Sequence, residues 1–185
     1  MTEKEIQTLI SRIQSGETEL FGQLFELFSD KIFCHVTFRV GDRETAKDLT
    51  SEVFLGAWQS LPKYHHQETA KFSTWLFSIA RRVIADYYRK YQRTDRGKVA
   101  LDDIAEFLPD KGLSPEELAA TKLISDRVVA AIQSLPPDMA EAVTLHYIDE
   151  MEHAEMATIT GKTEGNLRVL VHRGLSQIRK ILLSH

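Results

Sequence analysis

The helix expected at the end of the chain carries residue types that suit contact with duplex DNA. Arg168, His172 and Arg173 lie on its polar faces, where an arginine can pair with a guanine edge in the major groove. Asn166 suits bidentate pairing with adenine, and the helix N-terminus near Thr163 suits a phosphate. The apolar residues of this segment recur at helical spacing: Leu167, Val171, Leu175, Ile178 and Leu182. A short helix ending at Gly161 and a tight turn precede it, which is typical of a helix-turn-helix.

A second basic segment lies in the first half of the chain. Arg82, Arg89 and Arg93 share one face of the helix expected over Phe72–Arg93. The polar loop before this helix offers three rings, those of Tyr64, His65 and His66. Basic groups for phosphates beside flat rings for unstacked bases are what single-stranded DNA requires. Trp75 and Tyr87, at apolar positions of the helix, are expected in the core instead.

An acidic face is expected on the helix over residues 43–61. Asp48, Glu52, Leu55 and Gln59 follow one another at spacings of four, three and four, so they project together. An exposed leucine among acids suits docking on a protein partner. A solvated helix face with one exposed leucine is the simpler explanation of the spacing alone.

The residue patterns of enzymes and of metal or cofactor sites are missing from the sequence. It has no glycine-rich phosphate loop, no nucleophile elbow and no two-histidine zinc motif. Cys34-His35 and His65-His66 are adjacent pairs without metal-ligand spacing. We therefore expect no catalytic residues, no metal and no cofactor. The single cysteine, Cys34, excludes an internal disulfide framework and fits a small core residue in a reducing cytoplasm.

The distribution of charge says more about partners than its total, which is −4. Residues 81–98 hold seven basic residues against two acidic ones, and residues 161–185 hold five against one. Between them, residues 102–126 hold seven acidic residues against two basic ones. Local positive fields of this kind attract a polyanion, although solvated helix faces explain either basic block taken alone.

The hydrophobic pattern predicts an all-α protein with two small helical domains. The first domain is expected over residues 1–94, with helix boundaries at Gly16 and Gly41 and with Asp42 as an N-cap. Residues 95–113 lose periodicity and form the predicted acidic linker. The second domain, 114–185, starts with the helix signals Ser114-Pro115-Glu116-Glu117. Pro136-Pro137 then breaks this helix, and Asp138 is expected to cap the next.

Targeting and membrane signals are absent from the printed sequence. No run approaches the length of a membrane span, and the first residues lack the basic and apolar regions of a secretory signal. We expect a cytoplasmic protein without membrane insertion.

Three segments, in this order, resemble the extracytoplasmic-function (ECF) group of sigma-70 family RNA polymerase sigma factors. DRETAKDLTSEVFLGAW (Asp42–Trp58) resembles the segment that binds core polymerase. FSTWLFSIARRVIADYYR (Phe72–Arg89) resembles the helix that melts and reads the minus-ten promoter element. Residues 135–174 resemble region four, which reads the minus-thirty-five element. The resemblance covers about residues 17–183.

This resemblance implies a non-enzymatic specificity subunit that binds RNA polymerase core, promoter duplex and the non-template single strand. The contact with the clamp of the largest polymerase subunits carries over to Asp48, Leu49, Glu52 and Val53. Base capture carries over to the loop from Tyr64 to Lys71. Reading of the upstream element carries over to Arg168, Val169, His172 and Arg173. Family habit adds an anti-sigma factor as a partner.

The chain departs from the family pattern at several positions. Arg82 stands where Asn is usual, and Glu150 and Glu152 stand where Gly and Ser are usual, which predicts a lost helix cap. Lys162 replaces an apolar residue, Leu170 a basic one and Gly174 an alanine. Two alternatives stay open: a stand-alone helix-turn-helix regulator, and a helical interaction module that keeps the sigma fold without transcriptional activity.

Overall fold

The computed structural model describes residues 1–66, 70–93 and 126–183. The predicted linker 95–113, the cap at Ser114 and the side chain of Arg93 lie outside what it describes. The described backbone is helical without a β-strand, which confirms the all-α prediction. None of its helices has the length and hydropathy of a membrane-spanning segment.

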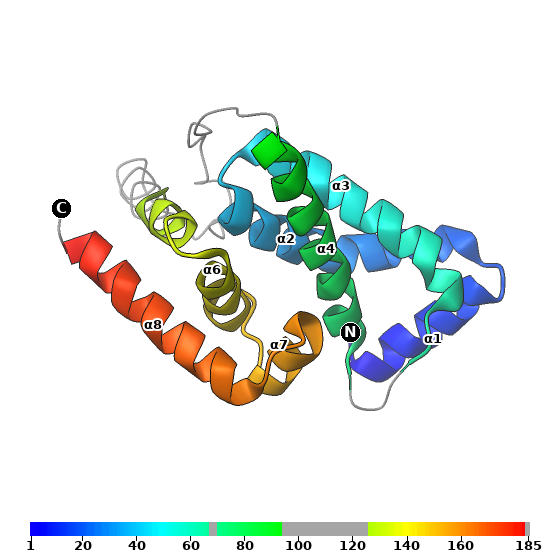
Figure 1. Ribbon diagram of the computed structural model, residues 1–185. Coiled ribbons are helices and arrows are strands. Elements are labelled where there is room, and N and C mark those ends of the chain that lie inside the picture. The colour runs from blue at the N-terminus through cyan, green and yellow to red at the C-terminus, as the bar shows by residue number, and fades with distance from the viewer. Residues whose placement is uncertain (67–69, 94–125, 184–185) are drawn as a thin grey trace, which may run out of the picture.

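The N-terminal unit, residues 1–93, contains four long helices (Figure 1). They are α1 (Glu3–Gln14), α2 (Phe21–Val40), α3 (Arg43–Ser60) and α4 (Phe72–Arg93), with short 3-10 turns at Thr18–Leu20 and Leu61–Lys63. Gly41 ends α2 with a φ of 76°, a conformation that favours glycine. The Asp42 carboxylate accepts the Thr45 N–H at 2.7 Å, so the predicted N-cap of α3 is confirmed.

The core of this unit lies where α2, α3 and α4 pack together. Leu24 and Ile32 of α2, Val53 of α3, and Phe72 and Leu76 of α4 are almost completely buried. These side chains follow the predicted helical periodicity and orient the opposite faces of α3 and α4 toward solvent. Phe25 is an exception, because it is adjacent to Leu24 in the apolar stripe of α2 and yet is 45% exposed.

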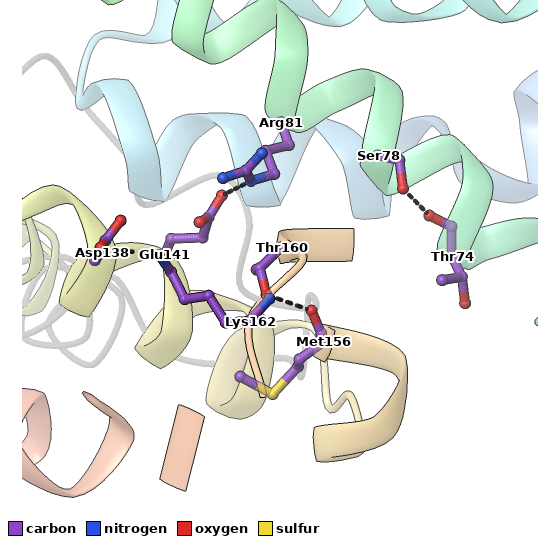
Figure 2. Close-up of polar contacts among 8 residues, drawn as sticks. All are labelled: Thr74, Ser78, Arg81, Asp138, Glu141, Met156, Thr160 and Lys162. Carbon is purple, nitrogen blue, oxygen red and sulfur yellow. Dashed lines mark hydrogen bonds and ion pairs between the residues drawn. The ribbon is translucent and has the colours of Figure 1, made fainter. Parts of the chain in front are cut away.

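The C-terminal unit, residues 126–183, is also helical. After helical residues 126–133 come α6 (Pro137–Val143), a π-helical turn (Thr144–Ile148), α7 (His153–Thr160) and α8 (Glu164–Leu183). The prediction that Asp138 caps α6 is wrong, because the helix begins at Pro137 and no side chain caps it. The Asp138 carboxylate instead accepts from Lys162 Nζ at 3.0 Å, which ties α6 to the turn before α8 (Figure 2).

The structure shows the consequences of three departures from the family pattern. Glu152 precedes α7, and its N–H donates to the Glu155 carboxylate at 3.2 Å, so the helix start keeps a capping contact. Glu150 has a φ of 54°, in the left-handed region where the usual glycine is unstrained. Gly174 is buried, and a Cβ there would lie 2.6 Å from Val143 Cγ2. Its glycine therefore permits close packing of α8 on α6.

The N-terminal and C-terminal units share one apolar core. Leu145, Met156 and Leu167 of the C-terminal unit are almost completely buried in the same cluster as the core of α1–α4. Figure 1 shows α7 beside the first turns of α4, while α6 and α8 extend away from α1 and α3. The sequence does not predict this contact, because nothing in the helical pattern separates a face buried within a unit from one buried between units.

Candidate nucleic-acid and protein interfaces

The helix-turn-helix consists of α7, a three-residue turn and α8. Gly161 ends α7 with a φ of 71°, and its N–H donates to the Ala157 carbonyl at 2.9 Å. The Thr163 hydroxyl accepts the Asn166 N–H at 3.3 Å and so caps α8. Leu167 and Val171 lie on the buried face of α8, and so determine which face of this helix points outward.

The outward face of α8 holds every residue predicted to contact the upstream duplex. All six are exposed: Thr163, Asn166, Arg168, Val169, His172 and Arg173. Arg168 pairs with Glu164 at 2.8 Å one turn earlier, so its guanidinium is held near the helix start. Val169 is 45% exposed and offers an apolar contact of the kind that a thymine methyl group makes. The face therefore combines charge, hydrogen-bond donors and an apolar side chain.

A small cavity lies where the loop before α4 meets α4 and α7. It measures about 190 Å³, and its lining includes His65, Lys71, Thr74, Trp75 and Thr158. The Thr74 hydroxyl is buried and has no hydrogen-bond partner among the described residues. Because buried polar groups are nearly always paired, an unpaired hydroxyl at a cavity wall suits a hydrogen bond to a ligand.

The structure corrects the expected role of Tyr64. Its side chain is only 8% exposed, and its ring packs on Phe72 and Trp75 at centroid distances of 5.5 and 4.9 Å. Gln7 donates to its hydroxyl at 3.3 Å. Tyr64 is thus a core residue that shapes one wall of the cavity, and its ring is not open to a stacked base. His65, His66 and Lys71 are exposed as predicted.

The basic face of α4 is only partly described. Arg82 and Arg89 are exposed, and Arg89 pairs with Asp86 of the same helix. Both lie on α4 beyond the cavity-lining Thr74 and Trp75, so they extend its surface with positive charge. This arrangement suits a strand that runs along α4 from the loop.

The acidic face of α3 presents three of the five predicted protein contacts to solvent. Asp48, Glu52 and Leu55 are exposed, and Leu55 is 56% exposed. Leu49 and Val53 are instead 5% and 0% exposed, so their assignment to a direct contact is corrected. They lie on the opposite side of α3, where they anchor the helix in the core.

Aromatic side chains extend this face in a way that the helical pattern does not predict. Trp58 is 39% exposed and packs edge-on against Phe21 at 5.0 Å. Phe25 packs on Phe54 at 4.7 Å while remaining half exposed. The α2 and α3 helices thus share an exposed apolar surface beside Asp48 and Glu52, which suits a protein partner more than solvent.

Metal or thiol chemistry has no support in the described part of the chain. No group of three or more His, Cys, Asp or Glu side chains there is arranged to hold a metal ion. Burial raises the pKa of the Cys34 thiol to about 11, so it stays protonated at neutral pH. Cys34 is half-buried, close to the predicted core position.

Comparison with known families matches both units. Residues 24–94 match Sigma-70 region 2, and residues 125–178 match Sigma-70 region 4. Region 2 thus contains the α3 face and all of the cavity lining except Thr158, and region 4 contains the α7–α8 motif with Thr158.

Proteins similar to this chain are ECF RNA polymerase sigma factors. The chain is 32% identical over 174 residues to the ECF RNA polymerase sigma factor BldN of Streptomyces coelicolor, covering 94% of this chain and 64% of that protein. It is 27% identical over 187 residues to the ECF RNA polymerase sigma factor SigW of Bacillus subtilis, covering 97% and 98%.

Solved structures share the fold. CnrH in complex with the cytosolic domain of CnrY has a TM-score of 0.70 at 20% identity, with 96% of each chain covered. RpoE in complex with the anti-sigma factor NepR from Bartonella quintana has a TM-score of 0.69 at 19% identity, covering 88% of this chain and 96% of that one. The two regions, their order and these relatives show that the chain belongs to the ECF group of the sigma-70 family of RNA polymerase sigma factors.

Proposed function

We propose that this chain directs core RNA polymerase to specific promoters through three separate surfaces. The observation that carries this proposal is that the α3 and α8 faces are exposed, while the loop and α4 form a cavity that Thr158 of α7 completes. Each is small, and contacts with nucleic acid are weakened by salt. Tethering them to one polymerase raises their effective concentration at a single promoter.

The α3 face is the proposed site for the polymerase clamp. Asp48 and Glu52 supply negative charge, and Leu55 supplies an exposed apolar anchor. We add Phe25 and Trp58 to this surface, since large exposed aromatics are typical anchors of protein interfaces.

The promoter contacts are divided between the two units. The α8 face reads the duplex upstream, with Arg173 and Asn166 as candidates for base contacts and Thr163 at a phosphate. The cavity beside Lys71 takes an unstacked base, with Thr74 as a hydrogen-bonding wall. Arg82 and Arg89, with Arg93 from the sequence prediction, contact the phosphates of the separated strand.

The proposal assigns no catalytic activity to the chain itself, and places its action in the cytoplasm with the polymerase. An anti-sigma factor is a proposed regulator. Support comes from RpoE, a protein of similar fold whose complex with the anti-sigma factor NepR has been solved.

The test is transcription in vitro by purified bacterial core polymerase, with and without this protein, on a library of promoter-sized fragments. New, sequence-dependent start sites that require the protein support the proposal and identify both recognition elements. Binding to core polymerase without transcription favours the inactive interaction module. Sequence-specific duplex binding without any binding to core polymerase favours the stand-alone regulator.

A further inference from the structure

We propose that the cavity between α2, α4 and α6 is a binding site for a small organic acid that carries one carboxylate on an aromatic or aliphatic body. The lining of this cavity shares no residue with the α3 face, the cavity beside Lys71 or the α8 face. A ligand bound here would touch none of the residues assigned above to polymerase or to promoter DNA, so its binding can be measured without either partner.

The size and the walls of this cavity suit a ligand with an apolar body. It measures about 390 Å³, and small-molecule sites in proteins typically measure roughly 300–1,000 Å³. Phe38 of α2, Ile84 of α4 and Ala140 of α6 give it apolar walls. Sites of this kind combine a mostly apolar lining with a few polar groups that orient the ligand.

Arg39 of α2 supplies a cation that the chain itself does not neutralise. Among the described residues, no carboxylate lies within ion-pair distance of its guanidinium. Burial is the main cause of the lowered pKa of this group, so its charge is held partly away from water. The Tyr88 hydroxyl donates to the Arg39 carbonyl, which ties this turn of α2 to α4. A guanidinium held in this way suits a bidentate pair with a carboxylate.

The two carboxylates of the lining already have cationic partners. Glu141 Oε1 accepts from Arg81 Nε at 2.8 Å (Figure 2). Asp138 Oδ2 accepts from Lys162 Nζ at 3.0 Å. Neither carboxylate is left to balance Arg39, so the remaining positive charge favours an anionic ligand over a neutral one.

Gln133 supplies a hydrogen-bond donor that is also unused. Its Nε2 atom is buried and has no hydrogen-bond partner among the described residues. The amide packs directly on Gly41, where a Cβ atom would collide with it, so the glycine makes room for Gln133 at the cavity wall. Because buried donors are nearly always paired, a turn of this amide toward a bound carboxylate would satisfy it. Arg39 and Gln133 thus offer donors to one carboxylate from two different helices.

Titration of the full chain with cinnamate tests the site, because this probe carries one carboxylate on an apolar body. Cinnamamide has nearly the same shape without the charge, and inorganic phosphate has charge without the apolar body. We expect isothermal titration calorimetry to give a dissociation constant below about 1 mM for cinnamate. Each of the other two probes should bind at least about tenfold more weakly. Equal binding of either one, or no binding of cinnamate up to about 10 mM, would overturn the proposal.

Two variants locate the bound probe. Arg39→Gln removes the unbalanced charge, and Ala85→Trp fills the cavity from its exposed rim. We expect each to weaken the binding of cinnamate at least about tenfold. Arg179→Gln removes the same charge at an exposed position of α8 outside the lining, and should change binding by no more than about twofold. Equal weakening by both arginine variants, or full binding by Ala85→Trp, would overturn the proposal.

Thermal unfolding distinguishes a ligand contact from a structural role of Arg39. Because Arg39→Gln removes a partly buried charge that no described carboxylate balances, we expect this variant to keep or raise the unfolding midpoint. Added cinnamate should raise the midpoint of the wild type, since it binds the folded chain, but not that of Arg39→Gln. A lowered midpoint of the variant without ligand would make Arg39 a structural residue and overturn its assignment. The transcription test above does not depend on any of these results.

Discussion

The imidazole of His35 and the carboxylate of Asp149 meet 2.6 Å apart, although 114 positions separate them in the sequence. His35 also packs edge-on against Phe77, so its ring is fixed from two sides. The pair therefore joins the last turns of α2 to the end of the π-helical turn at a point closed to solvent.

Replacing Asp149 with alanine is expected to lower the free energy of unfolding by about 2 kcal/mol, because it leaves a buried imidazole without its partner. Urea unfolding measures the loss. The double variant His35→Leu/Asp149→Leu should recover most of it, since no unpaired polar group remains. Asp30→Ala, at an exposed site, is the control and should change little. Losses that simply add in the double variant would contradict a direct coupling.

Gly174→Ala is expected to destabilise the protein by about 1–2 kcal/mol, even though alanine is the better helix former. The new Cβ would approach Val143 Cγ2 within 2.6 Å in a buried contact. Gly22→Ala, on an open helix surface, is the matched control and should be neutral or stabilising. Adding Val143→Ala to Gly174→Ala should relieve the close contact, and thermal unfolding that shows no such recovery would disprove this explanation.

Glu150→Gly is expected to stabilise the protein by about 1 kcal/mol. The φ of 54° lies in the left-handed region, which strains a residue that has a Cβ atom but does not strain glycine. Denaturant midpoints measure the gain. The control Glu152→Gly has a φ of −71° and should not gain stability. A loss in both variants would show that the Glu150 side chain makes a stabilising contact.

Asp48→Lys/Glu52→Lys is expected to weaken binding to core polymerase at least about tenfold by reversing the charge of the α3 face. Binding to a promoter duplex by the free protein should be unchanged, because α8 is untouched. Glu17→Lys/Glu19→Lys provides the same change of charge away from α3. Equal weakening by both pairs, measured by fluorescence anisotropy at fixed salt, would remove the α3 face from the interface.

Arg173→Ala is expected to cost about 1–3 kcal/mol of binding to the upstream duplex and to relax the preference at one base pair. Arg179→Ala, exposed further along α8, should weaken all sequences alike if it contacts phosphate. Competition binding with single-base variants of the duplex distinguishes the two. A uniform loss for Arg173→Ala would make it a phosphate contact.

The sequence predicts local structure well where one face of a helix decides the outcome. The Gly41 stop, the Asp42 cap and the turn at Gly161 all follow from local chemistry, and all are confirmed. The predicted α8 face is exposed throughout because a regular apolar stripe defines its opposite side. These features depend on neighbours within a few positions of the chain.

Long-range packing explains what the sequence does not predict. Tyr64 in a polar loop reads as exposed, yet its ring fills space between Phe72 and Trp75. Phe25 fits the core stripe of α2, but α3 leaves it at the edge, half exposed. The ion pair between Lys71 and Glu155 joins the loop before α4 to α7, and each of these segments taken alone reads as exposed to solvent. In each case the deciding partner lies far away in the sequence.

The apolar core shared by the two units ties the stability of the chain to any rearrangement that separates them. Any partner that needs the units apart must expose side chains such as Met156 and Leu145, which are almost completely buried in this structure. Its apparent affinity falls with the fraction of molecules that are open. Mutations that pack this core better would therefore stabilise the chain and weaken the binding of any such partner.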